Sequence, residues 1–145
     1  MIVGIGVDTV DIARFERQLA RTPALRARLF TPAEAVLGTP SLAARFAAKE
    51  ALIKALGGSA ELRWQDMEVQ RDEDRAPYFA PTPGLETALA ARGARRAHLS
   101  MTHDGGAATA FVVVESDGSA ASAGTAAERG TLATTAGSHD GRGQA

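Results

Sequence analysis

The chain has 145 residues, of which 16 are Lys or Arg and 17 are Asp or Glu, and it contains no cysteine. Residues 1–115 hold 14 residues of each sign, so the basic excess typical of nucleic-acid-binding proteins is missing. The lack of cysteine excludes disulfides, thiolate metal sites and cysteine nucleophiles, and agrees with a reducing compartment. The N-terminus meets Asp8 too early for a signal peptide, and no apolar run approaches the roughly 18–20 residues of a membrane span. We therefore expect a cytoplasmic protein that binds neither nucleic acid nor membrane.

Composition divides the chain near residue 116. The first 115 residues are enough for one domain with one hydrophobic core. In residues 116–145 Ala, Gly, Ser and Thr dominate, and Leu132 is the only large apolar residue. Such a segment buries too little apolar surface to offset its ordering entropy. The sequence thus predicts a disordered tail over 116–145, in which His139 is given no role.

The first half of the domain predicts a strand and two helices. Apolar residues fill Ile2–Val7 as in a strand, and apolar residues at helical spacing follow between Val10 and Ala20. Ser41 has the side chain of an N-cap for a central helix over Leu42–Leu56. The pair Gly57-Gly58 then provides a C-terminal stop.

The second half predicts short strands, a helix and a hairpin. Thr82 is an N-cap followed by Pro83 at the first helical position, and this helix runs to about Arg92. A turn over His103-Asp104-Gly105-Gly106 joins the last two strands. The predicted strands are Met67–Arg71, Pro77–Phe79, Ala97–Thr102 and Ala107–Glu115. Together the elements predict an α+β fold, with an antiparallel sheet packed on the central helix.

The central helix concentrates cations around one carboxylate. At 3.6 residues per turn, Glu50 and Lys54 share a side with Phe46, whereas Arg45 and Lys49 share another face. A Glu and a Lys four residues apart are also an ordinary helix-stabilising pair. The alternative is a site for a metal-bridged polyphosphate, and both interpretations stay open on the helix alone.

Two further segments supply candidate site residues. Gly4-Ile5-Gly6 resembles the start of a dinucleotide-binding fingerprint, but Thr9 stands where the third glycine belongs, so the glycines more simply allow a close backbone approach. Asp8 ends the apolar run, and on its own it is most simply a turn or helix-cap residue. Paired with Glu50, it could instead supply a hard oxygen ligand for Mg²⁺. His103 is either a solvated loop histidine or a site residue.

The order and character of these segments resemble the holo-acyl-carrier-protein synthase family, the small bacterial 4'-phosphopantetheinyl transferases. The resemblance covers roughly residues 1 to 115. The segments that carry it are Met1–Ile12, Phe30–Glu34, Arg45–Leu56 and Ala97–Val114. The chain departs from the family in a short stretch between Glu34 and Ser41, in Asp11 where glutamate is common, and in Gly57-Gly58-Ser59 where Gly-Thr-Gly is usual.

The resemblance implies transfer of the 4'-phosphopantetheine arm of coenzyme A to a serine of apo-acyl carrier protein, with release of adenosine 3',5'-bisphosphate. It assigns Mg²⁺ binding to Asp8 and Glu50. Lys54 would offset charge on the pyrophosphate. For the serine proton our hypothesis is acceptance by a metal-bound water or hydroxide, assisted by Glu50, which makes Glu50 and Lys54 the expected catalytic residues. His103 matches the family's histidine near the coenzyme A site. Arg45, Lys49 and Lys54 are either solvated helix charges or, beside a metal, cations that neutralise the phosphates of coenzyme A, and we expect the second. Among the helix cations we expect Lys54 nearest the metal centre and Lys49 the least involved. The family further implies a homotrimer with active sites between subunits.

An excess of arginine between Ile12 and Arg28 indicates a candidate surface for binding a partner protein. Between Ile12 and Arg28 five arginines stand against Glu16. They are Arg14, Arg17, Arg21, Arg26 and Arg28. An arginine strip is often only a solvated face, but the resemblance implies docking of an acidic carrier protein on Arg14, Arg17 and Arg21. Whether the carrier serves fatty-acid or polyketide synthesis stays open. Two other functions remain: another Mg²⁺-dependent phosphotransferase or hydrolase, and a non-catalytic carrier-binding module.

Overall fold

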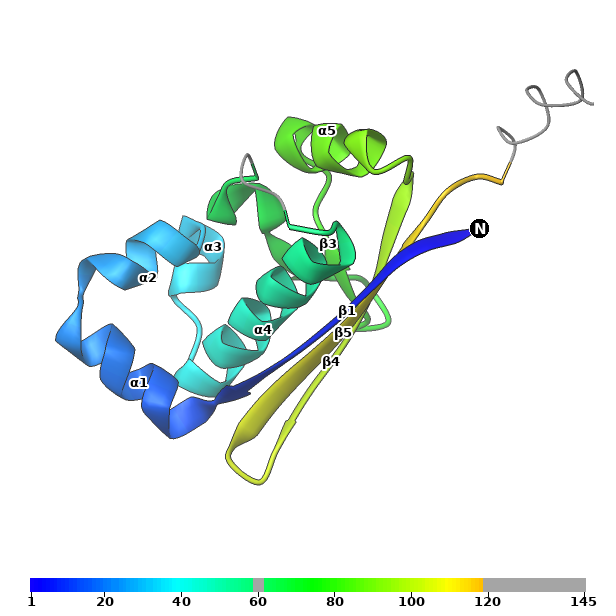
Figure 1. Cartoon of the computed structure of the whole chain (residues 1–145). Helices are drawn as coiled ribbons and strands as arrows, with labels where there is room; N and C mark the ends of the chain where they lie inside the picture. The colour runs from blue at the N-terminus through cyan, green and yellow to red at the C-terminus, as the bar shows by residue number, and fades with distance from the viewer. Residues whose placement is uncertain (59–61, 119–145) are drawn as a thin grey trace, which may run out of the picture.

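The computed structural model describes residues 1–58 and 62–118 and has the predicted α+β class (Figure 1). The strands are β1 (Ile2–Asp11), β2 (Val69–Arg71), β3 (Pro77–Phe79), β4 (Arg96–Asp104) and β5 (Ala107–Glu115). The helices are α1 (Ile12–Arg21), α2 (Ala24–Leu29), α3 (Pro32–Ala35), α4 (Thr39–Ala55), α5 (Pro83–Ala91) and a 3₁₀ helix, η1 (Trp64–Met67). No helix in the described ranges is long and apolar enough to cross a membrane. The predicted tail beyond residue 118 lies outside these ranges, but Ser116 still contacts the domain through its bond with the N-terminus.

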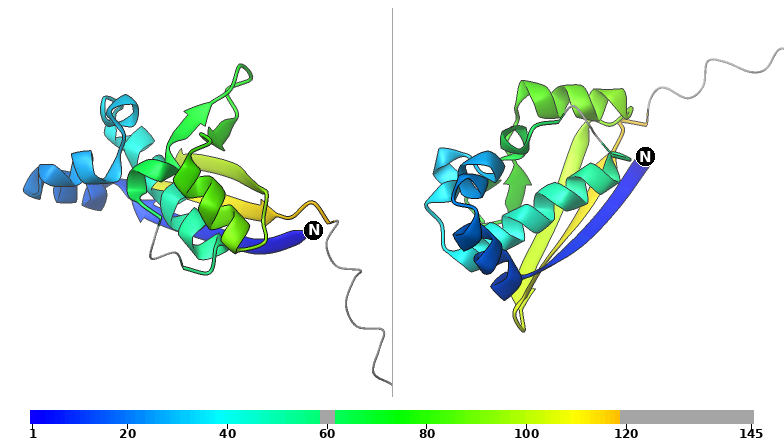
Figure 2. Two further views of the ribbon diagram at one scale, coloured as in Figure 1. Left: turned by 90° about the horizontal axis from the view of Figure 1, so that it is seen from above. Right: turned by 60° about the vertical axis from the view of Figure 1, so that its left-hand side comes forward.

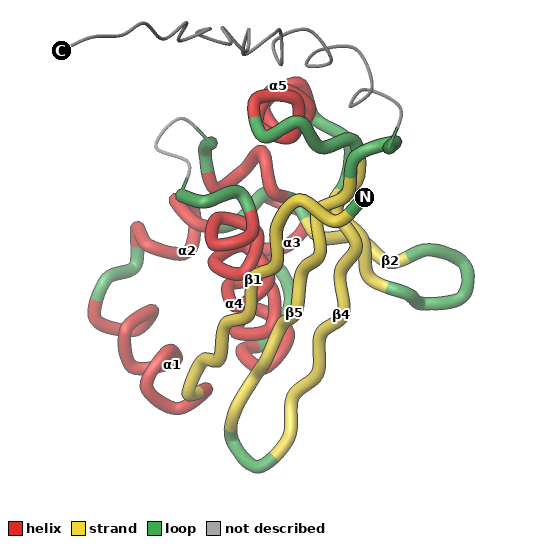
Figure 3. The backbone as a smooth tube through the Cα atoms, turned by 45° about the vertical axis from the view of Figure 1, so that its right-hand side comes forward, coloured by secondary structure: helices red, strands yellow, loops and turns green. Residues whose placement is uncertain are grey.

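One antiparallel sheet, in the order β1-β5-β4, packs against the central helix α4 (Figures 1 and 2). Helices α1, α2 and α3 lie together on one side of α4, away from α5 (Figure 1), and β2 and β3 form a small second sheet that projects from the domain (Figure 3). Small side chains let α4 approach the sheet, because Ala47, Ala48 and Ala51 are completely buried there. Single-sided packing of this kind gives the domain one core and leaves the other sheet face exposed.

The two glycines of β1 sit directly beneath the backbone of α4. A Cβ on Gly4 would lie 1.9 Å from the carbonyl oxygen of Ala55, and a Cβ on Gly6 would lie 1.9 Å from that of Ala51. The predicted close backbone approach is therefore confirmed. The dinucleotide interpretation fails, because β1 pairs antiparallel with β5 and is not the first strand of a parallel βαβ unit.

Several element boundaries differ from the predictions. The strand predicted to end at Val7 continues to Asp11, because β5 offers backbone partners along that whole length. Asp11 then caps α1, with its side chain accepting from the Arg14 amide at 2.7 Å. The central helix begins at Thr39 rather than after Ser41, because Pro40 has the fixed φ that suits a first helical turn.

At the hairpin, two glycines suffice for the turn. Gly105 and Gly106 adopt positive φ values of 55° and 79°, so the two-residue loop needs no further residue. His103 and Asp104, predicted in the turn, are therefore the last residues of β4. Two other predictions are confirmed: Thr82 caps α5, accepting from the Leu85 amide at 3.2 Å, and the C-terminal stop of α4 has positive φ at Gly57 and Gly58.

The contact between α4 and β1 predicts a steric limit at Gly6. We expect Gly6→Ala to lower the free energy of unfolding by about 1–3 kcal/mol, because the new methyl must push the Ala51 carbonyl away. Gly38→Ala is the matched control, since only Pro40 Cδ lies near a Cβ there, at 4.0 Å. Urea unfolding measures both variants, and equal losses would mean that the glycine contact does not limit the packing.

Candidate functional site

Asp8 and Lys54 meet where α4 crosses the edge strand β1. Lys54 Nζ lies 2.7 Å from Asp8 Oδ1 and 3.0 Å from the Val7 carbonyl oxygen. The Asp8 side chain is 18% exposed and the Lys54 side chain 51%, so the pair is open to solvent on one side. Asp8 caps no helix, since Asp11 fills that role. The structure thus joins two residues that are 46 positions apart in the sequence.

Glu50 lies one turn before Lys54 on α4, and it is partly buried. Burial raises the pKa of its carboxyl, the negative charge of Asp8 raises it further, and Lys54 opposes the shift. Lys54 gives its salt bridge to Asp8. The interpretation of Glu50 and Lys54 as a simple helix pair therefore does not describe this helix. The charges of Asp8 and Glu50 thus act on each other at this edge, with Lys54 beside them.

The donor set at this position fits a hard divalent cation. Mg²⁺ is commonly held by one or two carboxylates together with substrate phosphates and water. Within residues 1–58 and 62–118 no group of three or more His, Asp or Glu side chains gathers to hold a metal. Asp8 and Glu50 thus suit an ion whose remaining ligands come from substrate and solvent, but not a protein-enclosed metal site.

Arg45 and Lys49 lie on the opposite side of α4, as their spacing predicted. Lys49 is fully buried, and its ammonium donates to Glu34 Oε2 at 2.7 Å and to two backbone carbonyls. Arg45 is 8% exposed and donates to the carbonyls of Val69 and Ser41. Burial lowers the pKa of both groups, and Glu34 opposes that shift. The structure does not bring Lys49 to the carboxylate pair, because that side chain is committed to the interior.

His103 lies on the far edge of the sheet from Asp8. It is exposed at the end of β4 and pairs with Ala108, whereas Asp8 pairs with Ala110 on the other side of β5. Two strand spacings, about 10 Å, therefore separate their backbones across the sheet. Within one chain, His103 is not next to the carboxylates.

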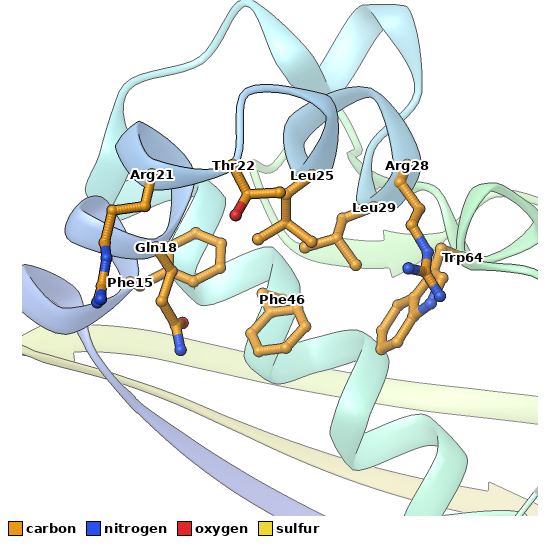
Figure 4. A pocket seen from close by; sticks show the side chains of 9 residues that line it. All are labelled: Phe15, Gln18, Arg21, Thr22, Leu25, Arg28, Leu29, Phe46 and Trp64. Carbon is orange, nitrogen blue, oxygen red and sulfur yellow. The ribbon is translucent and has the colours of Figure 1, made fainter.

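The arginine strip borders an aromatic hollow of about 440 Å³ (Figure 4). Phe46 stacks between Phe15 and Trp64, with ring centroids 5.2 and 5.6 Å away. In Figure 4 Arg21 and Arg28 lie at opposite ends of the hollow, and Leu25 lies between them. Arg14 and Arg17 are exposed on α1 outside the lining. Only Arg21 and Arg28 of the five arginines therefore border the apolar surface directly.

Sequence reasoning missed this hollow and the buried role of Glu34. The hollow is built from residues 15 to 64, whose separations follow no single helical period. For Glu34 a signal was present, since Thr31 and Glu34 have capping-box spacing. Both bonds of that box form, at 3.3 Å from the Glu34 amide to Thr31 Oγ1 and at 3.1 Å from the Thr31 amide to Glu34 Oε2.

Comparison with known proteins assigns the family. Residues 4–112 match the family model of the 4'-phosphopantetheinyl transferase superfamily. A holo-[acyl-carrier-protein] synthase of Leifsonia xyli subsp. xyli is 63% identical over 113 residues, which are 78% of this chain and 96% of that relative. The crystal structure of the Neisseria meningitidis holo-[acyl-carrier-protein] synthase has a TM-score of 0.73 at 35% identity, covering 79% of this chain and 99% of that one. The Helicobacter pylori holo-[acyl-carrier-protein] synthase, in complex with coenzyme A, has a TM-score of 0.68 at 33% identity and covers 77% and 99%. The chain therefore belongs to the holo-[acyl-carrier-protein] synthase family of 4'-phosphopantetheinyl transferases.

Proposed function

We infer that this protein transfers the 4'-phosphopantetheine moiety of coenzyme A to a serine of an apo-acyl carrier protein and releases adenosine 3',5'-bisphosphate. The observation that carries this inference is the cluster of Asp8, Glu50 and Lys54 at the edge of the sheet, in a chain of this family. Phosphoryl-group transfer requires mainly positioned groups and stabilised charge, and this cluster supplies both.

Asp8 and Glu50 would hold Mg²⁺ through their carboxylate oxygens. When bound, Mg²⁺ supplies charge neutralisation and orientation for the pyrophosphate of coenzyme A. Lys54 offsets negative charge that builds on the leaving phosphate, and its half-exposed side chain leaves it accessible to substrate. Its contacts with Asp8 and the Val7 carbonyl keep it at the site before substrate arrives.

Glu50 assists removal of the proton from the carrier serine. The bond that forms joins the serine oxygen to the β-phosphorus of coenzyme A, and the bond that breaks releases adenosine 3',5'-bisphosphate. The serine proton leaves toward Glu50, so the charges balance.

Contacts to coenzyme A come from more than one chain of a homotrimer. Lys54 contributes from α4, whereas Arg45 is buried on the opposite side of that helix and bonds backbone carbonyls, so it is not counted among these contacts. His103 contributes from a neighbouring subunit, because within one chain it lies across the sheet from Asp8. The exposed sheet face supports self-association. Its large apolar side chains include Ile5, Val7 and Phe111, which are 56%, 52% and 46% exposed. Covering such a face with a second copy removes apolar area from water.

The acidic carrier docks on the arginine strip of α1, with the aromatic hollow beside it. Arg14, Arg17 and Arg21 steer the carrier by charge, and the hollow accepts an apolar side chain of the docked surface. The combination of an apolar centre with charged residues at its ends suits a protein surface better than a small anion.

The test incubates the protein with coenzyme A, Mg²⁺ and an apo-acyl carrier protein, and weighs the carrier by mass spectrometry. Transfer adds one phosphopantetheine to the carrier. Hydrolysis of coenzyme A without carrier modification would point instead to another phosphotransferase or hydrolase. Carrier binding with no reaction would mean a non-catalytic carrier-binding module.

Substitution of either carboxylate should abolish most of this transfer. Asp8→Asn and Glu50→Gln each remove one of the two proposed Mg²⁺ ligands, and we expect a loss of about 100-fold or more in kcat/KM. Glu86→Gln on α5 is the matched control and should be fully active. Near-normal turnover of either site variant at millimolar Mg²⁺ would remove that residue from the metal site.

The raised pKa of Glu50 predicts how stability depends on pH in the absence of metal. The native protein binds this proton more tightly than the unfolded chain, so the carboxyl costs stability as pH rises from its ordinary pKa through the raised one. Glu50→Gln should therefore increase the free energy of unfolding in EDTA at pH 7. The increase should vanish below about pH 4, where the glutamate is protonated in both states. Urea unfolding measures this, and a Gln variant less stable than the parent at pH 7 would contradict it.

Charge reversal tests the arginine strip. Arg17→Glu together with Arg21→Glu should raise KM for the carrier by about tenfold at low salt and weaken its salt dependence, with KM for coenzyme A little changed. Arg95→Glu with Arg96→Glu makes the same charge change at the start of β4 and should leave carrier kinetics unaltered. Equal effects of the two pairs would show that only net charge matters.

A further inference from the structure

Lys49 is a buried ammonium with every proton engaged. Its Nζ donates to Glu34 Oε2 at 2.7 Å, to the Leu29 carbonyl at 2.8 Å and to the Trp64 carbonyl at 3.1 Å, which accounts for all three donors of a lysine. The side chain is 0% exposed, and Nζ lies 5.1 Å from the centre of the Phe30 ring. This lysine therefore joins three separate segments of the chain to helix α4.

Two of those acceptors belong to the walls of the aromatic hollow. Leu29 ends α2 and Trp64 begins η1, and both side chains line the hollow together with Phe46 (Figure 4). The other hydrogen bond between these two walls, from Gln65 Nε2 to the Ala27 carbonyl, is exposed. Lys49 is thus the buried connection that fixes both walls relative to the helix bearing Phe46.

Glu34 neutralises the lysine and anchors the remaining segments. Its Oε2 accepts from the Thr31 amide at 3.1 Å, and its Oε1 accepts from the Val69 amide at 2.9 Å. The pair is therefore completely hydrogen-bonded, as a buried charge pair must be to avoid a large desolvation cost. Stability alone does not require such a pair, because apolar side chains of similar volume often serve equally well. An apolar residue cannot, however, bond two wall carbonyls at once.

From this geometry we propose that Lys49 is a positioning residue for carrier recognition. Its ammonium holds the Leu29 and Trp64 backbones so that the hollow has the width and depth that an apolar side chain of the carrier requires. The identity of the occupant rests on the proposed function. Lys49 acts through these backbones and touches neither substrate, so its removal should weaken carrier binding more than the chemical step.

The main test is the double variant Lys49→Met with Glu34→Gln. It removes both charges, so that no unpaired charge stays buried, and it leaves the two wall carbonyls without their donor. We expect KM for an apo-acyl carrier protein to rise about tenfold, the scale of one or two lost hydrogen bonds. The value of kcat and KM for coenzyme A should change by less than about twofold. Val114→Ala, which opens a cavity at the far end of β5, is the control for lost stability and should not change KM for the carrier.

A second measurement needs no activity. Trp64 is the only tryptophan of the chain and lines the hollow, so its fluorescence reports the position of that wall. The double variant should show increased quenching by acrylamide, whereas Val114→Ala should match the parent.

Three outcomes would overturn the proposal. A folded double variant with unchanged carrier KM and unchanged Trp64 quenching would make the pair purely structural. If KM for coenzyme A rose and KM for the carrier did not, Lys49 would instead act in phosphate binding, as the sequence analysis proposed. An equal rise in carrier KM for Val114→Ala would attribute the effect to stability. If the parent protein does not modify the carrier at all, the proposed function fails instead, and the quenching comparison still decides whether Lys49 holds the wall.

Discussion

The close contact between α4 and β1 determines the geometry of the site. Because Gly4 and Gly6 have no side chains, the helix backbone comes within contact of the strand, and Lys54 can reach both the Val7 carbonyl and Asp8. The same approach brings Glu50 close enough to feel the charge of Asp8. A larger residue in the strand would separate the two elements and with them the carboxylates. The close packing of α4 on β1 therefore also sets the electrostatic interaction between Asp8 and Glu50.

The sequence predicted the parts of the fold that depend on local chemistry. The Thr82 cap, the Gly57-Gly58 stop and the close approach at the β1 glycines follow from the residues concerned. Boundaries that depend on a distant partner were predicted less well. The strand through Asp8 looked finished at Val7, because the residues of β5 that extend it lie about 100 positions later. The helix start at Thr39 was missed for a local reason, since Ser41 seemed a better cap than Gly38.

The helical period also explains which site residues could be predicted. It separates Glu50 and Lys54 from Arg45 and Lys49 correctly, but it does not say which face is buried. Four charges within ten residues suggest exposure, because buried lysines are rare unless paired. The partner that allows Lys49 to be buried is Glu34, and no periodicity connects it to the helix. A buried pair of this type becomes visible only when the packing of α3 on α4 is known.

Helix α4 thus carries one side of the aromatic hollow and two residues of the proposed catalytic cluster within about two turns. Phe46 forms part of the aromatic hollow, Lys49 turns inward, and Glu50 and Lys54 face the sheet edge. Phe46 and Glu50 are four residues apart and lie on one side of the helix, about 6 Å from each other along its axis. An apolar side chain bound over Phe46 is therefore held a short distance from the carboxylates, on a rigid element. If the carrier docks in the hollow as we propose, helix α4 fixes how far its bound side chain lies from the carboxylates.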